Sequence, residues 1–148
     1  MLEQASNAIN FKRKIMNTTT VNTEVTKSII LTTGMFDLLK DQIRRKKLSN
    51  INEENLNEQL KNAKQVLRRD LPDNVVDINR RVRLADIETG ETYTYSFVAP
   101  EKAKPKHKTI SILSPIGLAL IGYAEGTELS WEMDNGIRQY RIEEVAAL

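Results

Sequence analysis

Apolar positions between residues 28 and 70 recur with the spacing of two short helices. The β-branched run 28–31 and the polar residues 32–34 predict an extended segment that ends at a helix cap. One apolar stripe with helical spacing follows: Phe36, Leu39 and Ile43. After a polar break at 49–52 a second stripe appears: Leu56, Leu60, Ala63 and Leu67.

The second helix is predicted to begin near Asn52, whose side chain can cap it, and to run to about Arg69. Glu53 and Glu54 would then lie in its positive first turn. Two helices of similar length joined by a few residues pack antiparallel, so 27–70 is predicted to be a short helical hairpin. At roughly 1.5 Å per residue, an arm of about 13 residues reaches only about 20 Å.

The pattern changes to that of strands after Pro72, because proline cannot continue a helix. Apolar and polar residues alternate over 81–85, and the run 92–98 is aromatic and β-branched. A Thr-Gly turn at 89–90 separates the two runs, which predicts a β-hairpin. Residues 100–108 hold four lysines and two prolines, and are predicted to form an exposed loop.

A strand over 109–113 is predicted to lead into a short, densely apolar helix. Ser114 can cap this helix, Pro115 suits its first position, and Gly122 suits its end. So apolar a helix is expected to be buried against a sheet.

Alternation over 127–133 and the run 137–145 predict a final pair of strands. The sequence Asn135-Gly136 between them is typical of a type I′ turn. The carboxyl half is therefore predicted to be an antiparallel sheet with one packed helix, and the whole chain to be of the α+β class.

Residues 1–26 are rich in Asn and Thr and show no sustained apolar period. Such a segment can bury little surface, so we predict a mobile extension. The expected organisation is an extension at 1–26, a helical hairpin at 27–70 and a compact domain at 71–148.

Composition narrows the function. The 22 basic and 20 acidic side chains leave a net charge of +2, too small to indicate a nucleic-acid binder by itself. With no cysteine and one histidine, disulfides and the usual zinc ligand sets are excluded, so no metal site is predicted. No apolar run approaches the roughly 18 residues of a membrane span, and the start lacks a secretory signal core. We expect a cytoplasmic protein without a membrane partner.

No enzyme motif is present. The chain has no phosphate-cradling glycine loop and no nucleophile elbow, and its one histidine, His107, lies among lysines where solvent exposure is expected. The prediction is therefore a binding protein with no catalytic residues, no cofactor and no small-molecule substrate.

Two charged groups have alternative interpretations. Glu53 and Glu54 could share a divalent metal ion held elsewhere, but compensation of the helix dipole is favoured. Lys102, Lys104, Lys106 and Lys108, with the basic run 44–47, could make a weak nucleic-acid contact. Without interleaved aromatic residues, a solvated surface is favoured for both.

Several motifs occur in a specific order. The nine residues 114–122 read Ser-Pro-Ile-Gly-Leu-Ala-Leu-Ile-Gly, followed by Gly-Thr-Glu-Leu at 126–129 and Asn-Gly at 135–136. This order resembles the carboxyl-terminal domain of the bacterial Gre transcript-cleavage factors. The segment 74–82, Asn-Val-Val-Asp-Ile-Asn-Arg-Arg-Val, and the turn Pro-Glu-Lys at 100–102 resemble the Rnk relatives more closely still. The resemblance covers 71–145, and over 27–70 it is architectural.

The resemblance implies an FKBP-like fold and bacterial RNA polymerase as the partner. In the Gre family the loop before the Ser-Pro helix and the start of that helix contact the polymerase, which points to Pro100, Glu101, Ser114 and Pro115. The family loop is acidic, whereas this chain keeps only Glu101 among lysines.

Gre factors also reach down the polymerase secondary channel with a longer hairpin, whose acidic tip helps to hold a catalytic magnesium ion. Here the tip residues would be Asn52, Glu53 and Glu54, on arms too short for that reach. The expectation is a regulator that docks near the channel without stimulating transcript cleavage.

Two alternatives remain open. FKBP-like folds can carry peptidyl-prolyl isomerase activity, which needs an aromatic pocket; the candidate residues are Tyr93, Tyr95, Phe97, Tyr123, Trp131 and Tyr140. Strand alternation places the first three on one face, where a core role is favoured. The second alternative is a basic nucleic-acid-binding module that uses the lysine loop and the run 44–47.

Overall fold

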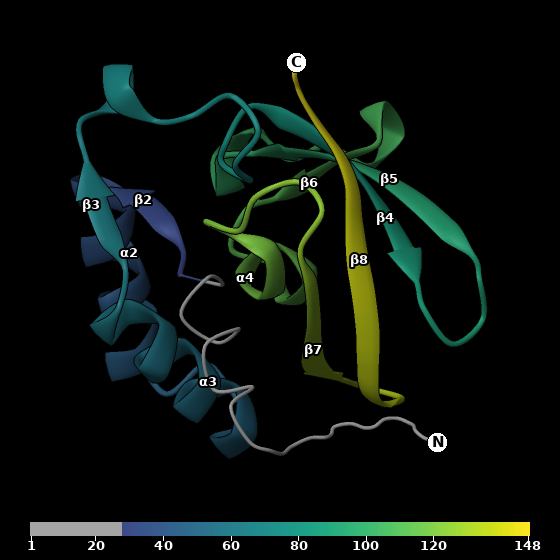
Figure 1. The fold of residues 1–148 in the computed structure, drawn as a ribbon, viewed down its shortest axis with the longest axis horizontal. Helices are drawn as coiled ribbons and strands as arrows, with labels where there is room; N and C mark the ends of the chain where they lie inside the picture. The colour runs from purple at the N-terminus through teal and green to yellow at the C-terminus, as the bar shows by residue number, and fades with distance from the viewer. Residues whose placement is uncertain (1–27) are drawn as a thin grey trace, which may run out of the picture.

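A computed structural model describes residues 28–148, so the extension predicted over 1–26 lies outside the described residues. The chain forms a helical hairpin beside a curled sheet, and helix α4 lies between them (Figure 1). This arrangement confirms the predicted α+β class.

The hairpin contains helices α2 (Thr33–Arg44) and α3 (Asn50–Lys61). As predicted, α2 follows an extended segment, β2 (Ile30–Thr32), and the Thr32 hydroxyl caps it by accepting a hydrogen bond from the Met35 amide at 3.2 Å.

Helix α3 differs from the prediction at both ends. Its cap is Ser49, whose hydroxyl accepts from the Asn52 amide at 3.2 Å, because the Asn52 side chain is engaged elsewhere. The helix ends at Lys61 and not near Arg69, because Lys64–Val66 forms strand β3 and pairs in parallel with β2. A single 3₁₀ turn, η2 (Arg68–Asp70), then leads to the sheet domain.

The sheet has five strands in the order β6-β5-β4-β8-β7. Their bounds are β4 Arg80–Asp86, β5 Thr92–Val98, β6 Thr109–Ser111, β7 Glu128–Met133 and β8 Gly136–Ala147. The predicted hairpins β4-β5 and β7-β8 are both present and antiparallel. The sheet is mixed, however, because β6 pairs in parallel with β5 after a loop that contains the 3₁₀ turns η3 (Pro100–Lys102) and η4 (Pro105–His107).

The turn between β7 and β8 is not the predicted type I′ turn. Met133 pairs with Gly136, so Asp134 and Asn135 are the turn residues. A type I′ turn needs positive φ at both central residues. Here the positive φ, +110°, belongs to Gly136, and Asn135 keeps a negative value, so glycine supplies the left-handed position after the turn.

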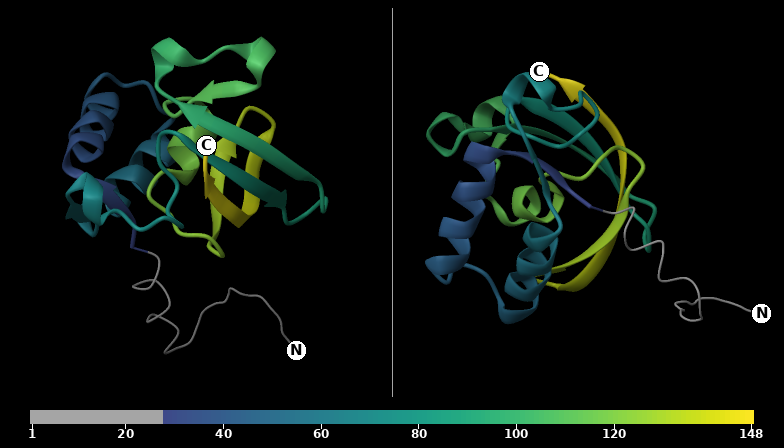
Figure 2. Two further views of the ribbon diagram at one scale, coloured as in Figure 1. Left: turned by 90° about the horizontal axis from the view of Figure 1, so that it is seen from above. Right: turned by 60° about the vertical axis from the view of Figure 1, so that its left-hand side comes forward.

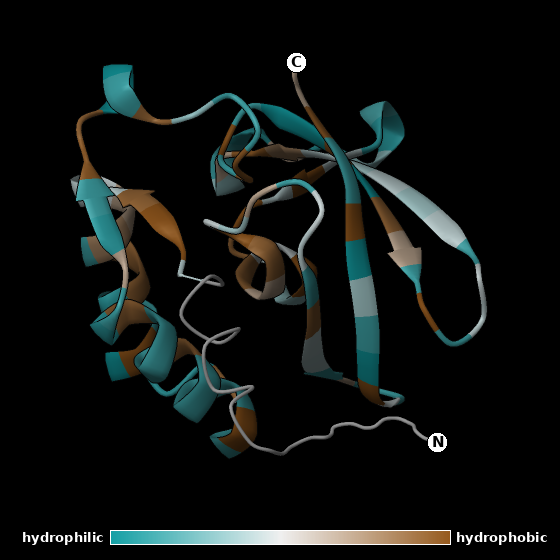
Figure 3. Cartoon of the chain, viewed as in Figure 1, coloured by the Kyte–Doolittle hydropathy of each residue, from teal (hydrophilic) through white to brown (hydrophobic). Residues whose placement is uncertain are grey.

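Helix α4 (Pro115–Leu120) lies in the concave face of the sheet, as its apolar sequence predicts (Figures 2 and 3). Gly117 allows the close approach, because a Cβ there would lie 2.2 Å from the carbonyl oxygen of Ile112. The helix is followed by Gly122, whose φ of +87° suits a residue without a side chain.

The hairpin and the sheet share one apolar core. Leu39 and Leu56 from the helices belong to the same buried cluster as Phe97, Leu120 and Ile142. Gly122 lies where the segment before the hairpin meets the sheet domain. Its carbonyl accepts a hydrogen bond from the Ile30 amide at 3.0 Å, and a Cβ at Gly122 would clash with the Ile29 side chain. The hairpin therefore packs along the domain.

Candidate functional site

The four predicted docking residues lie at one end of the sheet. Val98 pairs with Ser111 in the parallel pair β5-β6, so the segments that follow both strands leave from the same edge. Pro100 and Glu101 follow β5 and are exposed, while Ser114 and Pro115 follow β6. The parallel pairing therefore gathers residues from two separate parts of the chain.

Ser114 has a structural task in this group. Its hydroxyl accepts a hydrogen bond from the Gly117 amide at 3.2 Å and so caps α4. Its own amide donates to the Ser111 carbonyl at 3.0 Å. The hydroxyl is thus engaged in the helix cap, and Pro115, the first residue of the helix, is exposed.

The loop 100–108 is a positively charged rim beside these residues. Its four lysines are exposed, and none forms an ion pair with another residue in the described part of the chain. His107 is exposed too, as predicted. Concentrated positive charge of this kind favours an acidic partner surface.

The hairpin tip is fastened to the sheet. Asn52 is only 6% exposed. Its side-chain amide donates to the Glu132 carbonyl at 2.9 Å, and its Oδ1 accepts from the Glu132 amide at 3.0 Å. One side chain thereby pairs with the edge of β7 as a neighbouring strand would, and it is not free to bind an outside ligand.

The charges around the tip are largely paired with one another. Glu53 lies 3.3 Å from the Lys46 ammonium, and Asp41 forms ion pairs with both Arg44 and Arg45. Glu54 is exposed. The basic run predicted as a possible nucleic-acid contact is therefore partly neutralised within the hairpin, because Asp41 and Glu53 offset two of its four positive charges.

A hollow of about 400 Å³ connects the two groups of predicted residues. Pro115 lines one side, and Ser49 and Asn52 from the hairpin line the other. The fold thus brings the hairpin tip next to the start of the Ser-Pro helix, a juxtaposition that the sequence pattern does not reveal.

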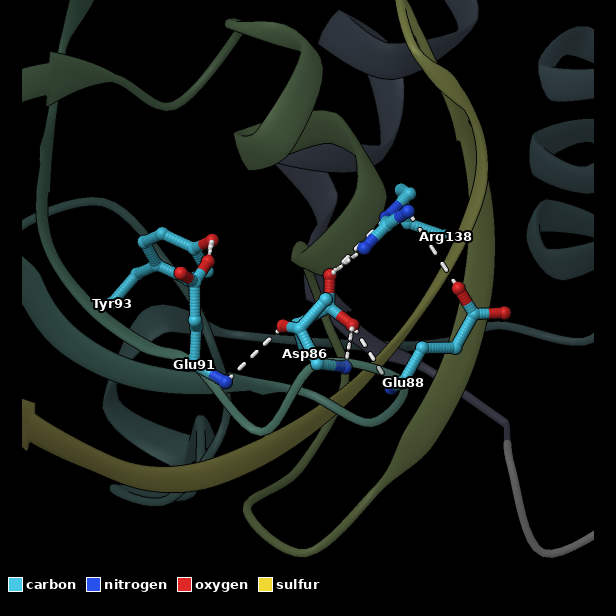
Figure 4. A network of polar contacts seen from close by, with 6 residues as sticks. Asp86, Glu88, Glu91, Tyr93 and Arg138 are labelled. Carbon is cyan, nitrogen blue, oxygen red and sulfur yellow. Dashed lines mark hydrogen bonds and ion pairs between the residues drawn. The ribbon is translucent and has the colours of Figure 1, made fainter.

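The most connected polar group lies elsewhere, at the β4-β5 turn (Figure 4). Buried Asp86 forms an ion pair with Arg138 at 2.6 Å and accepts from the amides of Glu88 and Thr89. The hydrogen bond from Arg138 holds the pKa of Asp86 below its usual value, although burial acts in the opposite direction. These bonds close a turn and join β4 to β8, so the role of the group is structural.

Aromatic side chains do not converge on one pocket. Tyr93, Tyr95 and Phe97 stack along β5, with ring centroids 6.3 and 5.7 Å apart, and the stack runs from an exposed end to a buried one. Hydrogen bonding to Glu91 raises the pKa of Tyr93 to about 12. Of the six aromatic candidates, Tyr123 and Trp131 line the hollow beside α3, and Trp131 also lines the hollow next to Pro115.

The described residues contain neither a metal-binding cluster nor a membrane-spanning helix. Within 28–148 no group of three or more His, Asp or Glu side chains is placed to hold a metal ion. Over the same residues no helix is long and apolar enough to cross a membrane.

Comparison with known protein families shows to which family the chain belongs. The family "Transcription elongation factor, GreA/GreB, C-term" matches residues 71–147, about half of the chain. The chain belongs to this GreA/GreB family. The match begins where the sheet domain begins and covers all five strands and α4.

Curated relatives point the same way. Transcription elongation factor GreA from Desulfovibrio desulfuricans is 44% identical over 41% of this chain and 38% of its own length. The regulator of nucleoside diphosphate kinase from Escherichia coli is 30% identical over 55% of this chain and 60% of its own length. The chain thus matches less than two thirds of either relative.

Among solved structures, a GreA/GreB factor from Nitrosomonas europaea superposes with a TM-score of 0.57 and 29% identity. The superposition covers 80% of this chain and 98% of that one. The similarity of fold therefore extends beyond the residues that the GreA/GreB family matches.

Proposed function

We propose that this protein binds bacterial RNA polymerase and regulates transcript elongation near the secondary channel without stimulating transcript cleavage. The observation that carries the proposal is a GreA/GreB domain whose helical hairpin is short and fastened along that domain. In this proposal 71–148 is the polymerase-binding domain and 27–70 is the hairpin that flanks it.

Length supports the absence of cleavage stimulation. Each helix of the hairpin has 12 residues. At 1.5 Å per residue this is about 18 Å, well short of a long channel-probing arm. The Asn52 contacts add a second restraint, because they hold the tip against β7. Glu53 and Glu54 would remain at the mouth of the channel.

The proposed docking face combines both groups of residues. Pro100, Glu101, Ser114 and Pro115 form its centre, the lysine loop forms one border, and the hairpin tip forms the other. The lysines would raise the association rate with an acidic surface and make it depend on salt. Such charge also allows a weak nucleic-acid contact as a minor part of binding. Action on polymerase places the protein in the cytoplasm.

A binding assay with purified core polymerase tests the proposal. Pro115→Asp adds a charge at the exposed first position of α4, where an acidic residue suits the helix. We expect this variant to bind at least about tenfold more weakly, a loss typical of a contact at the centre of an interface.

Thr94→Asp is the matched control, because Thr94 is exposed on β5 away from this face, and its affinity should match that of the wild type. Absence of wild-type binding at both low and moderate salt would refute the proposal. Equal binding of Pro115→Asp would refute the docking face.

A further inference from the structure

Strand β7 forms an edge of the sheet, and part of that edge is open. Both backbone groups of Glu132 point away from β8, since they pair with Asn52. Backbone direction alternates along a strand, so the N–H and C=O groups of Glu128 and Ser130 point to the same side. Within 28–148 these outward groups have no hydrogen-bond partner. The edge therefore offers donors and acceptors at strand spacing.

A hollow of about 170 Å³ lies beside this open edge. Most of its lining residues come from α3, α4 and β7. The apolar lining residues include Ile29, Leu56, Leu118, Ile121 and Leu129. A cavity of roughly 150 Å³ with such a lining can hold a benzene-sized group, so one apolar side chain fits here.

Trp131 forms part of the wall of the same hollow. Its side chain lines the hollow and is 4% exposed. The indole Nε1–H is fully buried and has no hydrogen-bond partner among the described residues. Because an atom that faces a hollow of this size would be accessible to water, the N–H points into the core, and the ring contributes an apolar wall to the hollow.

We propose that this groove binds a short extended peptide, which adds to β7 as a further strand. The peptide backbone pairs with Glu128 and Ser130, and one apolar side chain enters the hollow beside the Trp131 ring. Asn52 already makes this kind of pairing one step along the strand, and it limits the added strand to the Glu128 end.

Charge indicates which peptides the groove prefers. Glu128 is the one charged residue that lines this hollow, and its side chain is 54% exposed although it forms an ion pair with Arg141. The opposite wall contributes neutral Asn55 and Gln59. The groove should therefore select an extended segment in which apolar and basic residues alternate. This site shares Leu118 and Trp131 with the hollow of the docking face, but its test uses only the protein and a peptide, so the result does not depend on polymerase.

The single tryptophan of the chain makes the site directly observable. The probe is the peptide acetyl-Lys-Val-Lys-Leu-Lys-amide, titrated into the full chain. We expect a saturable change in tryptophan emission, with NMR shifts at the Trp131 indole and at the amides of Glu128 and Ser130. No saturable change, or shifts confined to the opposite edge at β6, would overturn the proposal.

Two N-methylated forms of the same peptide isolate strand pairing. Each carries methyl groups on alternate backbone nitrogens, so each blocks one edge of the extended peptide. One form should bind at least about tenfold more weakly because its hydrogen bonds to β7 are lost, and the other should bind like the parent. Equal affinity of the two forms would show that no strand is added.

A variant pair repeats the test from the protein side. Ser130→Pro removes an outward N–H at an edge position, where proline is tolerated, and it should weaken binding by about tenfold. Ser130→Ala keeps the N–H and should bind like the wild type. Wild-type affinity of a folded Ser130→Pro would contradict the proposal; if this variant does not fold, the N-methylated peptides decide.

Discussion

The two segments that carry the predicted functional residues, 99–115 and 45–54, look alike in sequence and differ in structure. Both are polar, charged links between regular elements. In the first, the charged side chains are exposed and without ion pairs in the described chain. In the second, the polar side chains bind one another and the sheet: Asn52 to Glu132, Glu53 to Lys46, and Arg45 to Asp41.

The difference shows that polar sequence does not by itself indicate a free surface. Segment 99–115 keeps its place through backbone pairing of its strand β6 with β5 and through the start of α4, and its charged side chains stay exposed. Segment 45–54 uses its own side chains to hold the hairpin against the domain. Variants that damage each anchor should therefore act on stability, and variants of the lysines should act on binding.

The largest effect should come from the anchor of the first segment. Gly117→Ala would place a methyl group 2.2 Å from a backbone oxygen of Ile112 and force α4 to move. We expect a loss of about 3 kcal/mol in the free energy of unfolding, measured by urea denaturation. Gly34→Ala in α2 is the matched control, since nothing lies within 4 Å of its Cβ position, and it should be neutral or stabilising. Equal stability of the two variants would refute this packing.

The anchor of the second segment should come next. Asn52→Ala leaves the partly buried Glu132 amide and carbonyl without their partner, which costs about 2 kcal/mol. Hydrogen exchange of the Glu132 amide should become faster at the same time. Asn57→Ala, on the exposed side of α3, is the control and should leave both measurements unchanged. Equal stability and equal hydrogen exchange of the two variants would show that the hairpin tip is not held against β7.

A smaller effect on stability, confined to acidic pH, is expected from Asp86, which lies outside both segments. The pKa of Asp86 is lower in the folded chain than its ordinary value of 3.8, so its ionised form stabilises the fold above that pH. This contribution is lost as the pH falls through the folded pKa. The difference in Tm between wild type and Asp86→Asn should be constant near neutral pH and shrink below 3.8. A difference in Tm that stays constant well below pH 3.8 would show that the ionised Asp86 does not stabilise the fold.

The smallest effect on stability should follow from changing the lysine loop. Replacing Lys102, Lys104 and Lys106 by Ala should alter the free energy of unfolding by less than about 0.5 kcal/mol, as for other surface substitutions. The same variant should lose polymerase affinity and much of its salt dependence. A large loss of stability would mean that this loop, like the tip, is tied to the domain.

Most of the fold could be predicted because its signals are local. Alternation over 92–98, the cap at Ser114 and the apolar run to Gly122 each define an element within a few residues. The errors occur where distant segments decide the structure. Helix α3 ends early because β3 pairs with β2, and Asn52 leaves the cap position to Ser49 because its partner, Glu132, lies 80 residues away in sequence.

In the candidate site, too, some features follow from local sequence and others depend on distant segments. The sequence order and the family resemblance single out the predicted docking residues, and the parallel pairing of β5 with β6 gathers them at one edge. The fastening of the tip and the hollow that joins Asn52 to Pro115 depend on packing between the two halves of the chain. No local pattern encodes that packing.

A transcript-cleavage assay on stalled elongation complexes tests the central claim most directly. The protein is added to complexes of core polymerase alone, and to complexes that also contain GreA. A short hairpin held against its own domain predicts no acceleration above the intrinsic rate, together with slower GreA-stimulated cleavage as the docking surface becomes occupied. Acceleration by the protein alone would contradict the account, because it would require carboxylates at the active centre that this hairpin cannot deliver.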